Sequence, residues 1–180
     1  RCLSRGLGDV YKRQAYLSFQ AQHIPLQAPQ EFIDKYLTTY EEGWDVLREQ
    51  RKNKAVEKGI FPPDKKIVDS MSSLDSWSAL DQESKKMIIK SMAVFAGMLD
   101  AMDFHIGRFM TYLKKEGLYE NTIFIVTADN GPEGNDPSDH APWREWFKTT
   151  IYDRDYETLG DQDSYVYIGT EFAQAMASPS

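Results

Sequence analysis

The stretch TIFIVT, residues 122–127, is apolar between its flanking threonines and mostly β-branched, and ADNGPEG follows it at residues 128–134. A short apolar run that ends in a turn sequence is typical of an internal strand of a parallel sheet. The sequence therefore predicts a buried strand whose carboxyl end carries Asp129 and Asn130.

A long helix is predicted directly before this strand. Asp81 is the expected N-cap, and Gly117 is the residue expected to end the helix. Between them, eight apolar residues recur at alternating spacings of four and three, which places them on one helix face: Ile88, Met92, Phe95, Leu99, Met102, Ile106, Phe109 and Leu113. We expect this face to pack on the sheet.

The remaining segments fit the same architecture. AYLSFQ, from residue 15, predicts a short strand before the loop HIPLQAP at residues 23–29. A capping box of Thr39 and Glu42 predicts a helix that stops near Gly59. Residues 64–80 are expected to form a loop with short helical turns. SYVYI and TEFAQAMA at the end suit a strand and a helical turn. The predicted fold class is therefore α/β, a partial and mostly parallel sheet flanked by helices.

Composition limits the possible partners. The 180 residues, enough for about one domain, carry a formal net charge of −7, which disfavours nucleic acid and anionic lipid as partners. No apolar run is long enough to insert into a membrane, and the single Cys2 excludes an internal disulfide.

The first segment differs from the rest of the chain. Residues 1–14, RCLSRGLGDVYKRQ, have neither periodicity nor caps and hold four basic residues against one acidic residue. They resemble adaptor read-through, a better explanation than a targeting leader because no apolar stretch accompanies the charge. We therefore expect residues 1–14 to be non-native and the native sequence to cover residues 15–180.

The residues after the two predicted strands carry the chemistry. Asp129 and Asn130 offer adjacent hard oxygen ligands suited to calcium or magnesium, although Asn-Gly is also an ordinary turn. His23 follows the first strand and would emerge at the same sheet edge if the strands run parallel. An imidazole there could bind an anionic ester or protonate its leaving oxygen. The alternative for His23 is a structural hydrogen bond.

Three stretches carry a family resemblance: HIPLQAP at residues 23–29, the segment from Leu99 to Gly134, and SYVYIGTEFAQAMASPS at residues 164–180. From about Ala15 to Ser180 the chain resembles the middle of a sulfatase of the arylsulfatase family, within the alkaline-phosphatase superfamily. The resemblance implies that residues 15–180 are an incomplete sulfatase catalytic domain. The resemblance implies hydrolysis of a small-molecule or carbohydrate sulfate ester, and export to the periplasm or the exterior. It also implies that His23 contacts the ester, that Asp129 and Asn130 bind a calcium ion (Ca2+), and that Asp129 accepts the nucleophile's proton.

The chain also departs from the family pattern. The family's nucleophile is a formylglycine made within a C/S-x-P-x-R motif, and no such motif is present, since Ser4 and Gly6 replace the proline and arginine after Cys2. The family's aspartate pair and lysine-bearing segments are missing too, and Lys148 matches neither. We therefore expect the chain alone to be nearly inactive, with the other metal ligands outside it.

Two other functions remain open on the sequence. A phosphodiesterase or phosphonate hydrolase of the same superfamily is one, although Asn130 favours a sulfatase because many phosphate-processing relatives carry histidine there. A non-catalytic binding module is the other. Further candidate residues have ordinary explanations: a packed or exposed helix position for His105, a solvated loop for Asp139 and His140, a pocket or sheet cover for Trp143, Trp146 and Phe147, and a solvated helix face for the basic stripe of Arg48, Arg51, Lys52, Lys54 and Lys58.

Overall fold

The computed structural model describes residues 14–67, 76–135, 143–149 and 155–179. Helices dominate this part of the chain. In chain order they are α1 (Gln30–Ile33), the 3-10 turn η1 (Asp34–Tyr36), α2 (Gly43–Glu57), η2 (Trp77–Ala79), α3 (Gln82–Lys115), η3 (Tyr119–Asn121), α4 (Trp143–Thr149) and α5 (Gly169–Ala177). The expected short helical turn within residues 64–80 is η2, and residues 68–75 of that segment lie outside the description.

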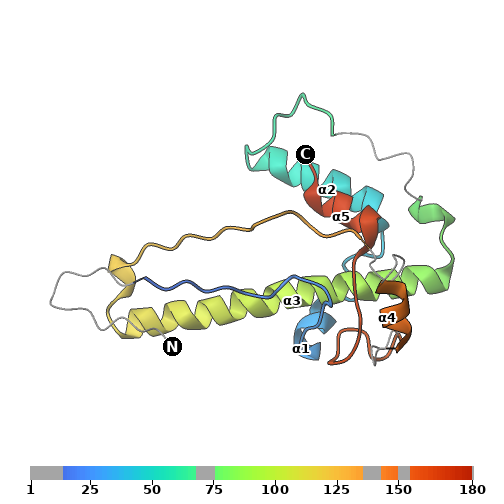
Figure 1. Cartoon of the computed structure of the whole chain (residues 1–180). Helices are drawn as coiled ribbons and strands as arrows, with labels where there is room; N and C mark the ends of the chain where they lie inside the picture. Colours follow the sequence, from blue (N-terminus) through green and yellow to red (C-terminus); the bar gives the residue numbers. More distant parts are fainter. Residues whose placement is uncertain (1–13, 68–75, 136–142, 150–154, 180) are drawn as a thin grey trace.

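Helix α3 is the long axis of the molecule (Figure 1). It begins as predicted, because the Asp81 carboxylate accepts a hydrogen bond from the Ser84 backbone N–H at 2.7 Å. It ends as predicted at Gly117, whose φ of 66° closes the last turn in the left-handed region that glycine tolerates. Local signals in the sequence thus set both ends of this helix correctly.

The predicted α/β fold is wrong for the described residues. Residues 122–127 are extended but unpaired, and Ile123, Ile125 and Val126 are 89%, 85% and 87% exposed. Residues 15–19 are likewise extended and exposed. The described residues contain no strand, and only an isolated bridge is found, at Ser164. A strand is stable only when neighbours satisfy its backbone N–H and C=O groups, and no such neighbour lies in the described ranges.

Without a sheet, the apolar face of α3 is covered over only part of its length. Met92 and Phe95 are buried, because α1 and the segment around residues 159–166 pack against this half of the helix. Leu99, farther along the same face, is 42% exposed. The expectation that the whole face packs on a sheet is therefore wrong, and the core lies at the amino-terminal half of α3.

Two glycines permit close approaches in this core. A Cβ on Gly97 would lie 2.9 Å from the backbone nitrogen of Ile33, so α1 sits directly on α3 at this point. A Cβ on Gly160 would lie 2.6 Å from Ile33 Cδ1 and 2.7 Å from Val94 Cγ2. Gly160 also has a φ of 97°, a conformation that side-chain-bearing residues rarely adopt. The turn at Gly160 thus packs directly against buried side chains at the centre of the core.

Helices α2 and α5 form a second packing unit around aromatic rings. Trp44 of α2 meets Phe172 of α5 edge to face, with ring centroids 5.5 Å apart, and Trp77 of η2 completes the cluster at 4.9 Å from Trp44. Such edge-to-face pairs add to the stabilisation from burial. The predicted helical turn over TEFAQAMA is confirmed as α5, whereas SYVYI forms no regular strand.

The start of α2 differs from the prediction. The helix begins at Gly43, and no side-chain hydrogen bond caps it, so the capping box of Thr39 and Glu42 does not form. Its end at Gly59 is as expected, with a φ of 68°. The helix starts later than the box requires: the observed N-cap is Glu42, which has helical dihedral angles, whereas the box would need Thr39 as an extended N-cap with Glu42 inside the first turn.

The basic stripe on α2 is only partly a solvated face. Arg48 is buried and donates from Nε to Ser178 Oγ at 3.3 Å, and Arg51 donates from Nη2 to the Met176 carbonyl at 2.8 Å. Cations near the carboxyl end of a helix interact favourably with its exposed carbonyls. Two arginines of the stripe therefore hold the end of α5, which corrects the expectation of a solvated face.

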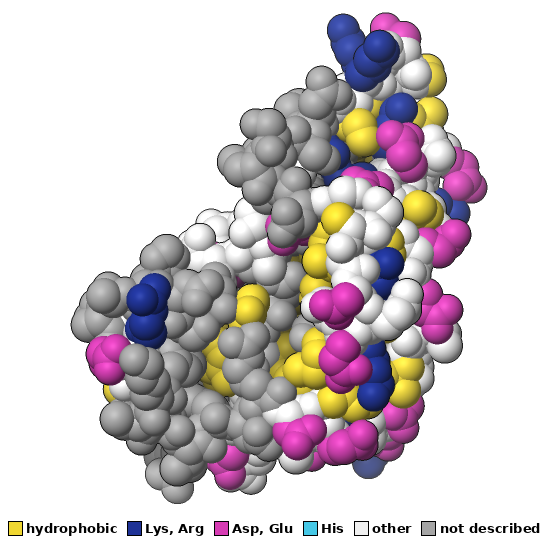
Figure 2. All heavy atoms as spheres, turned by 90° about the vertical axis from the view of Figure 1, so that its right-hand side faces the viewer, with side chains coloured by type: hydrophobic (Ala, Val, Ile, Leu, Met, Phe, Trp, Pro, Cys, Tyr) yellow, Lys and Arg dark blue, Asp and Glu magenta, His cyan; other side chains and the backbone are white. Residues whose placement is uncertain are grey.

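On the face seen in Figure 2, acidic side chains are scattered among basic and apolar ones, without a continuous basic patch over the described atoms. Within the described ranges, no helix is both long and apolar enough to cross a membrane.

Candidate functional site

The loop that carries His23 is fixed by hydrogen bonds to a distant part of the chain. His23 itself lies in a turn, where its backbone N–H donates to the Gln20 carbonyl at 2.9 Å. The residues after it are hydrogen-bonded to residues 160–166. The three bonds run from Leu26 N to the Val166 carbonyl (3.0 Å), from Ala28 N to the Gly160 carbonyl (3.0 Å) and from Gln27 Nε2 to the Ser164 carbonyl (3.1 Å).

The His23 ring is exposed and oriented by one contact. Its Nδ1 lies 2.7 Å from the Ile24 carbonyl oxygen. Because a carbonyl only accepts, Nδ1 must carry a proton and donate. Nε2 is then the atom left to act on a bound molecule, as an acceptor in the neutral ring and as a donor in the imidazolium. This arrangement suits binding an ester oxygen or protonating a leaving oxygen.

Asp129 and Asn130 lie on the second extended segment. Both are exposed, and the Asn130 amide nitrogen donates to the Gly131 carbonyl at 2.7 Å, which leaves its oxygen for another partner. Four residues further on, the Gly134 carbonyl accepts from Thr170 Oγ1 at 3.1 Å, and a Cβ on Gly134 would lie 3.0 Å from Ala173 Cβ. The segment is thus fastened to the first turn of α5.

The donor set fits the predicted calcium only in part. A carboxylate and an amide oxygen are ligands of the kind that calcium prefers, but calcium takes about six to eight oxygens. The described residues contain no cluster of three or more His, Cys, Asp or Glu side chains that could hold a metal ion. Asp129 and Asn130 would therefore supply two ligands of a larger set.

Both candidate loops are attached to the same support. The His23 loop is bonded to residues 160–166 and the Asp129 segment to Thr170, so one continuous stretch, residues 159–177, anchors both. In Figure 1 the extended segments that lead to them run in the same direction along α3. In the described residues no hydrogen bond or ion pair joins His23 to Asp129 or Asn130. The structure therefore shows that residues 159–177 hold both loops, and within the described ranges it shows no hydrogen bond between His23 and the Asp129–Asn130 pair.

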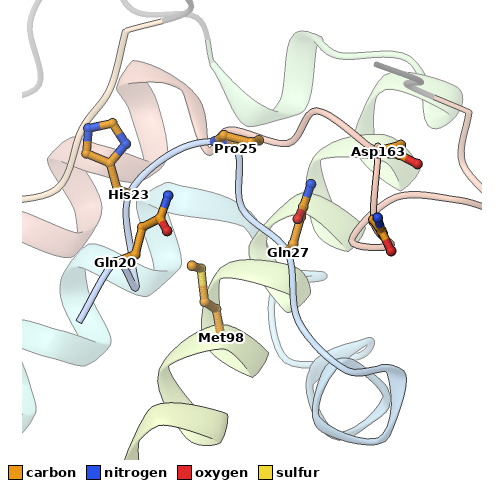
Figure 3. A pocket seen from close by; sticks show the side chains of 7 residues that line it. Gln20, His23, Pro25, Gln27, Met98 and Asp163 are labelled. Atoms are coloured by element: carbon orange, nitrogen blue, oxygen red, sulfur yellow. The ribbon is translucent and has the colours of Figure 1, made fainter. Parts of the chain in front are cut away.

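A cavity of about 360 Å³ lies beside His23 (Figure 3). Its polar lining comes from Gln20 and Gln27 on the His23 loop and from Gln162 and Asp163 on the turn opposite. Asp129 and Asn130 are not among its described lining residues. Gln162 and Asp163 were not among the residues that the sequence predicted for the site. Their one signal was adjacency to SYVYI, a stretch that carries the family resemblance.

The other candidate residues take no part in this cavity as described. His105 is exposed on α3, with its Nδ1 3.0 Å from Arg108 Nη1, in agreement with an ordinary surface position. Trp143 and Trp146 are exposed on α4, where their rings pack at 90° with centroids 6.2 Å apart. Asp139, His140, Cys2 and the side chains of Phe147 and Lys148 lie outside the described residues.

Comparison with known proteins identifies the family. The family model called Sulfatase matches residues 12–163. The chain is 38% identical over 168 residues to an uncharacterized sulfatase of Schizosaccharomyces pombe and 32% identical over 165 residues to an arylsulfatase of Klebsiella aerogenes, and each match covers 92% of this chain. A sulfatase of Formosa agariphila is 27% identical over 152 residues, 79% of this chain. The chain therefore belongs to the sulfatase family, which acts on sulfate esters and typically binds a metal ion.

The chain spans about a third of the length of these relatives, 30% of the first, 35% of the second and 27% of the third. It is thus a partial sulfatase domain, and two thirds of what such a relative contains has no counterpart in it.

Proposed function

We propose that this chain is part of a sulfuric ester hydrolase, in which His23 acts on the ester oxygen and Asp129 and Asn130 contribute to a calcium site. The observation that carries the proposal is the shared anchor: the His23 loop and the Asp129 segment are both hydrogen-bonded to residues 159–177. Family membership supplies the reaction class.

In this proposal the imidazolium form of His23 donates its Nε2 proton to the leaving alcohol oxygen as the S–O bond breaks. The bond from Nδ1–H to the Ile24 carbonyl holds the ring so that Nε2 faces outward during this transfer. Asp129 accepts the proton of the attacking group, which comes from outside this chain because no C/S-x-P-x-R motif is present. When bound, a calcium ion would polarise the sulfate oxygens and neutralise their charge.

The proposal is tested in a full-length protein that contains this segment. We expect hydrolysis of 4-nitrophenyl sulfate to exceed hydrolysis of 4-nitrophenyl phosphate, since the alternative of a phosphodiesterase or phosphonate hydrolase predicts the reverse. The 180-residue chain alone should show almost no turnover. Strong turnover by the chain alone would contradict the requirement for an external nucleophile.

Two variants separate the proposed roles. His23→Ala should lower kcat by about 10²- to 10⁴-fold with unchanged calcium content, and Asp129→Ala should lower both turnover and calcium content. Matched controls are His105→Ala and Asp64→Ala, which remove an exposed histidine and an exposed aspartate away from the cavity. If Asp129→Ala leaves calcium affinity unchanged, the metal role is wrong, and a non-catalytic turn at Asp129–Gly131 becomes the better account.

A further inference from the structure

The cavity beside His23 has a lining suited to hydroxyl groups. Its lining includes three residues with amide side chains and one with a carboxylate, Gln20, Gln27, Gln162 and Asp163, together with Met98 of α3. In Figure 3, His23 and Asp163 stand on opposite sides of the pocket, with Gln27 between them. Its volume of about 360 Å³ lies in the range of small-molecule sites, about 300–1,000 Å³. The polar groups are therefore held around a space large enough for a small organic group.

Asp163 has a left-handed backbone conformation at this cavity. Its φ of 69° is the one positive value for a non-glycine residue in the described ranges. The next residue, Ser164, is buried, and its hydroxyl donates to the Asp161 carbonyl at 2.8 Å and accepts from the Gly160 N–H at 2.9 Å. Aspartate is one of the few residues with a side chain that tolerate this conformation, and the turn keeps Asp163 among the residues that line the cavity.

The amide of Gln27 is oriented by the same turn. Its Nε2 donates to the Ser164 carbonyl at 3.1 Å, which leaves Oε1 as the acceptor available to a bound molecule. Acceptors on Gln27 and Asp163 suit the O–H donors of an alcohol. The carboxylate does not suit a sulfate group, because the two carry the same charge. The cavity therefore favours the alcohol portion of an ester over its sulfate portion.

We propose that Asp163, with Gln27 and Gln162, binds hydroxyl groups of the leaving alcohol and so selects sulfate esters of sugars over aryl sulfates. This inference rests on the proposed function, because it assigns the cavity next to His23 to the alcohol of the ester that His23 acts on. It makes Asp163 a specificity-determining residue with no part in breaking the S–O bond.

The test uses the full-length protein, a monosaccharide sulfate and 4-nitrophenyl sulfate. Asp163→Gly removes the carboxylate and suits the positive φ, which offsets part of the chain entropy that a glycine adds to the unfolded state, so the variant should still fold and melt close to the wild type. We expect its KM for the monosaccharide sulfate to rise about tenfold or more, as for a lost hydrogen bond to a charged group. Its kcat/KM for 4-nitrophenyl sulfate should stay within about twofold. Asp163→Asn tolerates the same φ and keeps an acceptor oxygen, so its KM for the monosaccharide sulfate should lie between those of the wild type and Asp163→Gly. Asp64→Gly is the control.

Each result decides the inference. An equal loss on both esters, or no loss on either, would overturn it. If the wild type hydrolyses neither ester, the proposed function has failed, and the cavity is then tested by titrating the protein with the unsulfated monosaccharide. Binding by the wild type that Asp163→Gly abolishes would still support a hydroxyl site, whereas no binding, or equal binding by both proteins, would overturn it.

Discussion

Replacing Gly160 with alanine tests the junction that supports the His23 loop. The added Cβ would meet Ile33 Cδ1 at 2.6 Å and Val94 Cγ2 at 2.7 Å, and both side chains are fully buried, so neither can move aside into solvent. The Gly160 carbonyl also accepts a hydrogen bond from the backbone N–H of Ala28 at 3.0 Å, and Ala28 belongs to the same HIPLQAP loop as His23. Gly160→Ala should therefore disturb the core and the candidate site together.

The expected magnitude has two parts. Forcing a Cβ into the left-handed region costs about 1–2 kcal/mol, and overpacking a well-filled core costs about 1–3 kcal/mol. The free energy of unfolding should thus fall by about 2–5 kcal/mol if the two effects add. Gly117→Ala provides the matched control, because Gly117 has a φ of 66° and nothing within 4 Å of its added Cβ. It should lose only the backbone part, about 1–2 kcal/mol.

Urea unfolding of the expressed chain, followed by circular dichroism and tryptophan fluorescence, measures both variants against the parent chain. Gly107→Ala serves as the opposite control, because its Cβ on α3 meets nothing within 4 Å and alanine favours the helix by about 1 kcal/mol. If Gly160→Ala is no less stable than Gly117→Ala, then the packing of the turn against Ile33 and Val94 is not as described, and the support of the His23 loop must be reconsidered.

Three further predictions concern the stability of the chain. Arg51→Ala should lower the free energy of unfolding by about 1–3 kcal/mol, because its Nη2 donates to the Met176 carbonyl at 2.8 Å, whereas Lys58→Ala on the exposed end of α2 should change it little; equal effects in urea unfolding would refute the docking role. The Ser84 N–H holds the pKa of Asp81 below its ordinary value. This carboxylate therefore stabilises the fold above its unfolded-state pKa, and the contribution is lost as the pH falls through the folded-state pKa. The difference in melting temperature between Asp81→Ala and the parent chain should shrink in acid, and a constant difference would refute the cap. Burial raises the pKa of Tyr40. Its contribution to the free energy of unfolding is therefore complete below the ordinary phenol pKa and is lost as the pH rises through the folded-state pKa. Tyr40→Phe should lose less stability in alkali than the parent chain, and parallel curves of stability against alkaline pH would show that Tyr40 is not buried.

Local signals predicted much of the helical structure. Asp81 and Gly117 set the ends of α3 because a cap and a left-handed glycine act over a few residues. TIFIVT has the composition of a strand, but a strand needs partners from elsewhere in the chain, and the described residues contain none for it. The sheet was therefore predicted from the composition of one segment, although a strand also requires a partner segment from elsewhere in the chain.

Only part of the candidate site was predicted, because the rest depends on contacts between segments that lie far apart in the sequence. His23 and the Asp129–Asn130 pair stood out by residue type and position after apolar runs, and their roles stay predictions. The cavity could not be foreseen, because Asp163 comes near His23 only through the hydrogen bonds between residues 26–28 and 160–166. Arg48 was assigned to a solvated face since its charge alone does not show that α5 covers it.

The most direct test of the central claim is a crystal structure of a full-length protein containing this segment, with an unreacted sulfate ester and calcium bound. We expect His23 Nε2 to lie about 2.7–3.2 Å from the bridging ester oxygen, and side-chain oxygens of Asp129 and Asn130 to ligate a calcium ion that contacts the same sulfate. A His23 ring too far from that sulfate for a hydrogen bond, or a metal held without Asp129, would contradict it.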